Sequence, residues 1–295
     1  MREVAVATVG FFDGVHLGHR EVIRTLVSAA RERGEEAIVF SFWPHPRTVL
    51  QQDARELRLL SSLDEKREML LGLGVDRVEV LPFSRKFAAL SARNFVSMLR
   101  DDYGVTRLVM GYDNRIGCDH LTASAISVPS VLVEVVSGLC IAQEQPISST
   151  IIREALAEGD IELANGMLGY SYGLRGVVVA GNRMGRTIGF PTANMKLYEP
   201  LKLLPGGGVY SVEVEVIGGK YKGMCNIGTR PTVGGTVRTI ETNIFDFDED
   251  IYGLPLNLQF VKRLRSEVRF PSLEALKLQL EKDREAAKAS FGDRL

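Results

Sequence analysis

The chain has 295 residues, which is longer than one average domain and predicts two domains of ordinary size. With 45% hydrophobic and 25% charged residues it can bury a sizeable core, which excludes a disordered chain and a membrane-embedded one. A formal net charge of -1 provides no basic surface for nucleic acid, so we expect small-molecule partners, no nucleic acid and no membrane, with self-association left open.

The cysteines favour a reducing compartment. Cys118, Cys140 and Cys225 are odd in number and widely spaced, and no C-x-x-C pair is present. The apolar run at residues 4–12 is too short for a signal sequence and is broken by Asp13 and Gly14. No apolar segment is long enough to span a bilayer, so we expect a soluble, cytoplasmic protein.

The first half alternates strand and helix patterns. Residues 4–12 predict a buried strand, apolar residues at helical spacing predict a helix from residue 20 to the stop at Gly34, and residues 37–42 predict a second strand. The pattern repeats with helices at 63–73 and 94–100 and strands at 78–81 and 108–111. This order predicts a Rossmann-like α/β domain, a parallel sheet with flanking helices, whose ligands lie beyond the carboxyl ends of the strands.

The stretch GFFDGVHLGHR, residues 10–20, follows the first predicted strand and holds two of the four histidines, His16 and His19. A metal site needs three or four ligands, and no third histidine or carboxylate has local spacing to join them. A helix end would explain one histidine but not the glycines. Gly14 and Gly18 allow the backbone to approach a ligand, and a helix N-terminus favours an anion. Phosphate binding is therefore the favoured interpretation.

The second half has a different pattern. Short helices are predicted at 150–158 and 161–167, and the composition changes at residues 169–173. Alternating strands follow at 210–217, 221–227, 237–247 and 256–261, separated by glycine-rich turns, and a last helix has Ser272 as its cap and Glu274 in its first turn. We predict a small antiparallel β-barrel with a terminal helix, and domains at residues 1–169 and 170–295.

A second candidate site lies in GNRMGRTIGFPTANM, residues 181–195, after a predicted strand at 176–180. The loop lacks the ending of a Walker A motif. Thr192 and Asn194 offer a hydroxyl and an amide oxygen, hard ligands that suit Mg²⁺. Glu241, in IETNIFDFDEDIYG, would alone be an exposed strand carboxylate in a salt bridge, but with this loop it becomes a candidate general base for attack on a γ-phosphate.

Two stretches of the first half resemble the signatures of the nucleotidyltransferase superfamily. FDGVHLGH resembles its H-x-G-H signature, and ISSTIIREAL, residues 147–156, resembles its second one. The resemblance implies that both stretches converge on the phosphates of ATP, with Asp113 of GYDNRIG lining the pocket. The residues that it assigns to this site are Gly10, Phe12, Asp13, Gly14, His16, Gly18, His19, Asp113, Ser149, Thr150 and Arg153.

The second half resembles the riboflavin kinase domain through its loop, its Glu241 strand, NIGTRPTV (226–233) and RFPSLEAL (269–276). With SFWPHPRTVL and LPFSRKFAALSARNFV in the first half, the whole chain resembles the bacterial bifunctional riboflavin kinase/FMN adenylyltransferases, or FAD synthetases. This implies a kinase with Glu241 as catalytic base, Mg²⁺ on Thr192 and Asn194, and ATP and riboflavin as substrates. The implied phosphate loop consists of Gly181, Arg183, Gly185, Arg186, Gly189, Pro191 and Thr192.

The first half would then join FMN to a second ATP, giving FAD and pyrophosphate. Since the nucleophile is already an ionised phosphate, His16 and His19 would act by positioning and charge stabilisation. The chain departs from the family at Asn243, where a histidine is usual, at Asn114, where an aromatic is usual, and at Cys118 and Asp119, where a basic residue is common. The departures at Asn114 and Asp119 motivate one alternative, a kinase-only enzyme. A second alternative is a non-catalytic flavin-binding module, which would have no need of the base Glu241.

Overall fold

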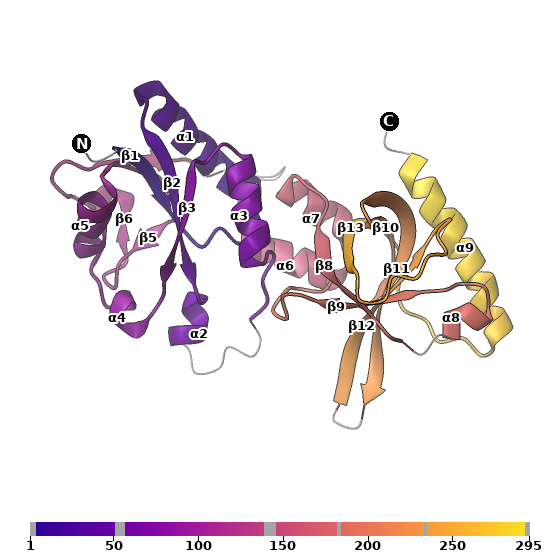
Figure 1. The fold of residues 1–295 in the computed structure, drawn as a ribbon. Helices are drawn as coiled ribbons and strands as arrows, with labels where there is room; N and C mark the ends of the chain where they lie inside the picture. Colours follow the sequence, from indigo (N-terminus) through magenta and orange to yellow (C-terminus); the bar gives the residue numbers. More distant parts are fainter. Residues whose placement is uncertain (1–3, 51–56, 139–145, 182–183, 233–234, 293–295) are drawn as a thin grey trace. The chain divides into compact units, whose positions relative to one another are not determined.

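The computed structural model describes residues 4–50, 57–138, 146–181, 184–232 and 235–292. The chain forms two compact units, residues 1–149 and 150–295 (Figure 1). In the part of the chain that is described, no helix is long and apolar enough to cross a membrane.

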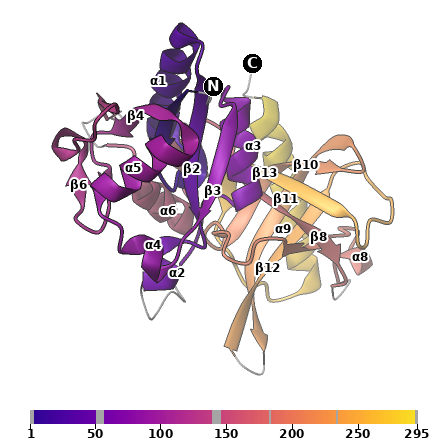
Figure 2. The ribbon, with the colours of Figure 1, turned by 60° about the vertical axis from the view of Figure 1, so that its left-hand side comes forward.

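The first unit is built on a five-stranded, all-parallel sheet in the order β3-β2-β1-β4-β7. Helices α1 (Leu17–Arg33) and α5 (Ala92–Tyr103) cover its opposite faces (Figure 2). The prediction of a parallel α/β domain is confirmed. The strands are β1 (Ala5–Val9), β2 (Glu36–Trp43), β3 (Arg77–Pro82), β4 (Val105–Gly111) and β7 (Leu132–Val136).

Side chains alternate between the two layers of this core. On β1, Val6 packs with the α1 side, whereas Ala5 and Ala7 pack with the α5 side. The central strands are buried on both faces and therefore read as continuous apolar runs. The smaller elements of the unit are α2 (Pro46–Leu50), α3 (Leu63–Gly72), α4 (Arg85–Ala88), β5 (Arg115–Ile116), β6 (Leu121–Thr122) and the 3₁₀ turns η1 (Asp13–Val15) and η2 (Ala123–Ala125).

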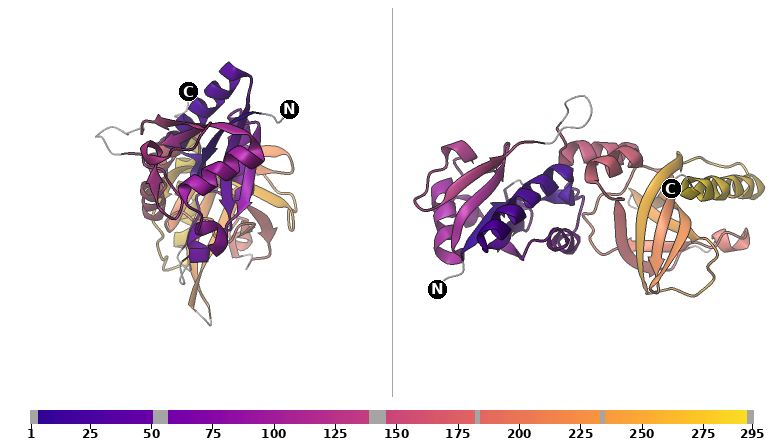
Figure 3. Two further views of the ribbon diagram at one scale, coloured as in Figure 1. Left: turned by 90° about the vertical axis from the view of Figure 1, so that its left-hand side faces the viewer. Right: turned by 90° about the horizontal axis from the view of Figure 1, so that it is seen from above.

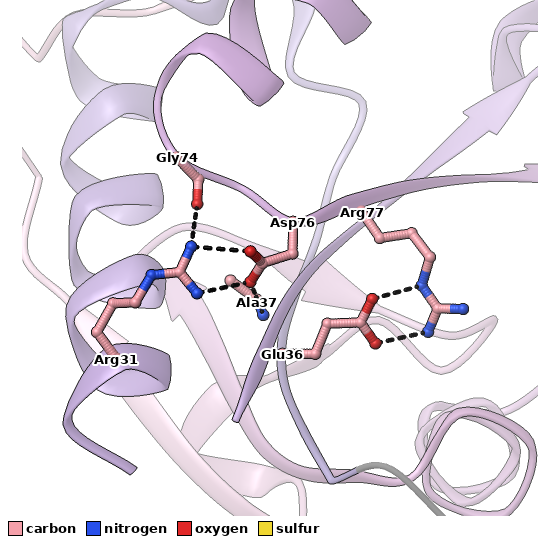
Figure 4. Close-up of polar contacts among 6 residues, drawn as sticks. All are labelled: Arg31, Glu36, Ala37, Gly74, Asp76 and Arg77. Carbon is pink, nitrogen blue, oxygen red and sulfur yellow. Dashed lines mark hydrogen bonds and ion pairs between the residues drawn. The ribbon is translucent and has the colours of Figure 1, made fainter. Parts of the chain in front are cut away.

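A polar network joins α1 to the amino ends of β2 and β3 (Figure 4). Arg31 donates to both carboxylate oxygens of Asp76 at 2.8 Å, and Asp76 also accepts from the amide of Ala37 at 2.9 Å. The hydrogen bond from Arg31 lowers the pKa of Asp76, and the Ala37 amide adds to this effect. This network ties α1 to the amino ends of β2 and β3, whereas the loops of a site in a parallel sheet lie at the opposite, carboxyl ends.

The second unit contains a closed, antiparallel, six-stranded barrel in the order β10-β11-β12-β9-β8-β13. Helix α9 (Leu273–Gly292) lies along its outside, where Ala287 and Phe291 join the apolar cluster of Val209, Met224 and Val261 (Figure 3). The predicted barrel with a terminal helix is confirmed. The strands are β8 (Gly173–Val179), β9 (Ala193–Leu197), β10 (Gly208–Val216), β11 (Gly219–Thr232), β12 (Gly235–Ile244) and β13 (Pro255–Arg265), and the helices before and within the barrel are α6 (Ser149–Glu158), α7 (Ile161–Leu168) and α8 (Met184–Thr187).

Several predicted boundaries are wrong. The first strand ends at Val9, because Phe12 adopts a left-handed conformation. Helix α1 begins at Leu17 because His16 caps it, three residues before the predicted start. Strand β12 stops at Ile244, since Asp246 is left-handed with a φ of 54°. The segment predicted to be one glycine-rich loop holds α8, and Asn194 lies on β9.

A buried ion pair fixes α9 to the barrel. Arg265 on β13 contacts the Asp283 carboxylate through Nε at 2.9 Å and Nη2 at 2.8 Å, and Gln279 donates a further hydrogen bond at 2.9 Å. The Asp283 side chain is nearly inaccessible to solvent. Removing one partner of such a pair leaves an uncompensated buried charge.

We therefore expect Asp283→Ala to lower the free energy of unfolding of the barrel unit by about 3–5 kcal/mol. Calorimetry of the whole chain would follow the two units separately, and only the barrel transition should move to a lower temperature. Glu285→Ala, an exposed acid on the same helix, is the matched control and should move it little. An unchanged barrel transition in Asp283→Ala would contradict this account of α9.

Candidate functional site

The first candidate site lies where the order of the parallel strands reverses. The chain proceeds outward from β1 to β3 and then returns to β4, so β1 and β4 are neighbours whose loops leave in opposite directions. Such a switch point leaves a crevice at the carboxyl ends of the strands. The loop after β1 begins at Gly10, and Asn114 after β4 donates from Nδ2 to the carbonyl of Val9 at 2.7 Å. The two loops of the crevice are thus joined directly.

The loop after β1 has a strained backbone. Phe12 and Val15 have φ angles of 52° and 38°, and Gly14 has a φ of 77°. The left-handed region costs a non-glycine residue on the order of 1–2 kcal/mol. Strain of this kind persists only where surrounding contacts impose it, and it is common at ligand-binding loops.

The segment before α3 imposes this conformation. The Asp13 carboxylate accepts from the amides of Leu60 at 2.9 Å and Ser61 at 3.1 Å, and Ser61 Oγ accepts from the amide of Gly14 at 3.0 Å. Asp13 is only 4% exposed. Its carboxylate therefore works as a scaffold for the loop, a role that the sequence pattern did not indicate.

The two histidines lie together at the start of α1. His16 is the N-cap, and its Nδ1 accepts from the amide of His19 at 3.3 Å. The rings stack with centroids 3.6 Å apart and planes 18° from parallel. Because Nδ1 of His16 is an acceptor, the neutral ring carries its proton on Nε2.

His19 is held in its neutral form. Burial lowers its pKa well below the usual value, and the charges of His16 and Lys66 lower it further. Within the described residues, Nδ1 of His19 has no hydrogen-bond partner. A buried ring nitrogen without a partner, at the N-terminus of a 17-residue helix, suits a ligand with hydrogen-bonding oxygens.

The glycines of this loop make room for the aromatic rings. A Cβ at Gly18 would lie 3.3 Å from the His16 ring, and a Cβ at Gly10 would lie 3.0 Å from the Phe12 ring. Both distances are tighter than ordinary contact. Gly10 and Gly18 are therefore needed because a side chain at either position would press on a neighbouring ring. Neither glycine has the positive φ that would otherwise explain it.

The second predicted signature begins beside this loop. Ser149 Oγ donates to the carbonyl of Asp13 at 3.0 Å, although 136 residues separate them. Asp113 is exposed after the end of β4. Thr150 and Arg153 follow Ser149 on α6, where Thr150 is exposed and Arg153 is half-buried.

The departures from the family pattern have partners in the structure. Asp119 accepts from the amide of Ala92 at 2.9 Å, at the start of α5, while Cys118 is exposed. Asn243 is buried and donates from Nδ2 to the carbonyl of Pro191 at 2.7 Å. Each of Asp119, Asn243 and Asn114 therefore stabilises a loop or a helix end.

The second candidate site is a cavity of about 350 Å³ in the barrel unit. Its lining includes the apolar side chains of Phe190, Met224 and Phe270. The polar side chains that line it are those of Thr192, Asn194, Asn226, Arg230, Glu241, Asn243, Arg265 and Glu267. A cavity of this volume, lined by both apolar and polar side chains, suits a flat heteroaromatic molecule that carries a polar chain.

The predicted residues of this site meet on two paired strands. Glu241 on β12 lies directly opposite Asn194 on β9. The Glu241 carboxylate forms an ion pair with Arg230 Nη2 at 3.2 Å, with both side chains partly exposed. This contact holds the carboxylate at the cavity wall; Arg230 is a residue that the sequence analysis did not identify.

A neighbouring cavity of about 230 Å³ lies against the other face of β12. Glu241 and Asn243 line the first cavity, whereas Thr242 and Ile244 line this one. Thr192 lines both. The second cavity also includes Val178, Arg186, Pro191, Ala193, Phe247, Asp248, Glu249, Asp250, Ile251 and Tyr252.

The predicted phosphate loop lies at the junction of the two cavities. A Cβ at Gly181 would collide with the Asn194 side chain, and one at Gly185 would collide with the carbonyl of Phe190, so both glycines allow close packing. Gly189 has a φ of 81°. Arg183 lies outside the described residues. Among the residues that are described, no three His, Cys, Asp or Glu side chains are placed to hold a metal ion.

Comparison with known proteins matches the two halves of the chain to two families. The sequence model of the FAD synthetase family matches residues 1–151, and that of riboflavin kinase matches residues 168–291. A solved structure described as a macrolide-efflux protein from Streptococcus pneumoniae is similar with a TM-score of 0.91 and 33% identity, covering 98% of this chain and 95% of that one.

Curated relatives match over nearly the full length. The bifunctional riboflavin kinase/FMN adenylyltransferase of Bacillus subtilis is 38% identical, over 98% of this chain and 93% of its own. The Escherichia coli K12 protein of the same name is 39% identical, over 99% and 94%. Since both family models match in the predicted order and these relatives match end to end, the chain belongs to the family of bifunctional riboflavin kinases/FMN adenylyltransferases.

Proposed function

We propose that the 350 Å³ cavity of the barrel unit binds riboflavin and that the neighbouring cavity binds ATP. Glu241 would take the proton of the terminal ribityl hydroxyl, whose oxygen attacks the γ-phosphorus while ADP leaves. The observation that carries this proposal is that Thr192 lines both cavities and that Glu241 lies opposite Asn194 at their junction.

The donors at this junction fit a magnesium ion. Thr192 supplies a hydroxyl and Asn194 an amide oxygen, and both are hard ligands of the kind that Mg²⁺ takes when it keeps most of its water. Gly181 packs so closely on Asn194 that the phosphate loop and this side chain are adjacent. Bound there, Mg²⁺ would neutralise charge on the phosphates of ATP. Gly185, Arg186, Gly189 and Pro191 would complete the phosphate site, with Arg183 as a further member.

We propose that the first unit transfers the adenylyl group of ATP to FMN. A phosphate oxygen of FMN would attack the α-phosphorus of ATP, forming FAD and releasing pyrophosphate. The ionised phosphate needs no general base, so this chain's contribution is to bind and orient both phosphates. His16 and His19, as neutral donors at the start of α1, would contact them. The other residues assigned to this site are Gly10, Phe12, Asp13, Gly14, Gly18, Asp113, Ser149, Thr150 and Arg153.

We propose that residues 1–169 form the adenylyltransferase domain and residues 170–295 the kinase domain. We also propose a cytoplasmic location, which the free thiols of Cys118 and Cys225 support.

A kinase-only enzyme is the second candidate, because Asn114, Cys118 and Asp119 depart from the family pattern. The hydrogen bonds of Asn114 and Asp119 favour an intact site instead.

A timed chromatographic assay with riboflavin, ATP and Mg²⁺ tests the proposal. We expect riboflavin to decline, FMN to appear first, and FAD to follow together with pyrophosphate. Accumulation of FMN without FAD, even when FMN is supplied, would favour the kinase-only enzyme. Flavin bound stoichiometrically without turnover would indicate a binding module.

A further inference from the structure

Lys66 is a buried cation behind the loop that follows β1. It lies on α3 and is only 2% exposed. Its Nζ donates to the carbonyl of Phe11 at 2.7 Å and lies 3.7 Å from the centroid of the Phe11 ring. Lysine is almost never fully buried unless it is paired, so this placement requires a reason.

Lys66 binds the carbonyl of the residue that directly precedes the left-handed turn of the loop. Phe11 directly precedes Phe12, where the backbone enters the left-handed region. The Phe11 ring also packs against the His45 ring, with centroids 4.2 Å apart and planes 67° from parallel. Lys66 therefore fixes both the backbone and the ring of the residue before the strained turn.

We propose that Lys66 is a positioning residue of the adenylyltransferase site: its ammonium clamps Phe11 and so holds the phosphate-binding loop in its strained conformation. The inference rests on the proposed adenylyl transfer. Lys66 is too buried to act as a ligand itself, and it acts through the loop that leads to His16 and His19 at the start of α1. Charge-assisted hydrogen bonds are roughly twice as strong as neutral ones, so the clamp depends on the charge of Lys66.

That charge can be removed at moderately alkaline pH. Burial lowers the pKa of Lys66 to about 8, while the Asp13 carboxylate opposes this effect. The titratable groups that surround the clamp from its own and neighbouring elements are Asp13, His16, His19, His45 and Glu65, whose carboxylate accepts from the Ser62 amide. Lys66 is charged below about pH 8 and neutral above it, so FAD formation should decline as the pH rises through 8.

The contribution of Lys66 to the free energy of unfolding should rise with pH, whereas the rate of FAD formation should fall. Because the pKa of Lys66 is lower in the folded protein than the usual 10.5, the unfolded chain binds more protons between about pH 8 and 10.5. The contribution of Lys66 to stability therefore rises with pH in this window. If Lys66 were purely structural, FAD formation and stability would change together as the pH rises. If the charged ammonium positions the loop, FAD formation should fall above pH 8 while stability does not.

The test compares Lys66→Met, Lys66→Arg and the control Arg67→Met, whose parent is the exposed neighbour on the same helix. Supplied FMN and ATP measure FAD formation. Riboflavin phosphorylation by the same chain shows that the barrel unit is folded, and the calorimetric transition of the first unit shows that the unit carrying Lys66 is folded. We expect Lys66→Met to lower kcat for FAD formation at least tenfold, with FMN formation within twofold of wild type. Lys66→Arg should retain more activity than Lys66→Met and should lose the decline above pH 8, because arginine stays charged.

Three results would overturn the inference. The first is a Lys66→Met variant with the wild-type rate and pH profile. The second is a Lys66→Met variant that loses both activities in parallel. The third is a profile for FAD formation by the wild-type protein that stays flat to pH 9. If the wild-type protein forms no FAD at all, the adenylyltransferase assignment itself fails, which separates the two conclusions.

Discussion

Replacing Glu241 by glutamine is expected to slow riboflavin phosphorylation by about 10²–10⁴-fold, the usual contribution of a positioned general base. Conversion of supplied FMN to FAD should keep its wild-type rate, because Glu241 lies in the barrel unit and the histidine loop in the other. Glutamine keeps the shape of the side chain but cannot accept the hydroxyl proton. Initial rates with riboflavin, and separately with FMN, measure both effects in one preparation.

The expected loss of rate is this large because no neighbouring side chain can easily take over the role of Glu241 as general base. Its carboxylate is held by Arg230 at 3.2 Å, and its partner across the strands is Asn194. The amide and hydroxyl groups at this junction, of Asn194, Asn243 and Thr192, are poor bases at neutral pH. The remaining carboxylate of the cavity is Glu267, which has a hydrogen bond of 3.4 Å from the Thr229 amide.

Glu267→Gln is therefore the matched control. It removes the same charge from the same cavity, and we expect it to change KM for riboflavin more than kcat. Glu241→Asp should recover part of the activity, since it restores a base at the cost of reach. If Glu267→Gln abolished phosphorylation and Glu241→Gln did not, the roles of the two carboxylates would be exchanged.

The fold was predictable where pattern alone determines structure. The buried strands of the first unit are continuous apolar runs, and Gly34 and Gly104 end helices in left-handed conformations. Strand β7 was not predicted: it is an edge strand whose Leu132 and Val135 are exposed, so its apolar residues do not follow a core pattern. Strand β9 was missed because its pairing with β8 and β12 is long-range.

The site was predictable only in its residue types. The motifs indicated His16, His19 and Glu241, whereas the residues that hold them depend on tertiary contacts. Lys66 stands among charged residues on a predicted helix, where a solvated side chain is the ordinary expectation, and nothing local reveals that it is buried. Arg230 reaches Glu241 only because β11 and β12 pair.

The double variant His16→Ala/His19→Ala should convert riboflavin to FMN at the wild-type rate and form FAD at least about 10²–10³-fold more slowly, the usual loss for one oriented donor. The double effect should be less than the product of the single effects, because the rings stack at 3.6 Å and His16 also caps α1. His16→Asn and His19→Asn, which keep a donor, should retain more activity than the alanine variants. Loss of FMN formation in the double variant would indicate misfolding rather than a catalytic role.

The pH dependence distinguishes neutral donors from charged ones at this site. Since burial keeps the pKa of His19 well below its usual value, the ring is neutral near pH 7 and its protonation state should change little down to pH 6. FAD formation should therefore be nearly constant between pH 6 and 7, below the decline expected from Lys66, whereas an imidazolium ion would give a rate that rises as the pH falls. The lowered pKa also means that His19 favours folding above its unfolded value of about 6.5 and that this contribution is lost as the pH falls. A rate of FAD formation that increases as the pH falls would show that His19 acts as a cation and would contradict its proposed role as a neutral hydrogen-bond donor.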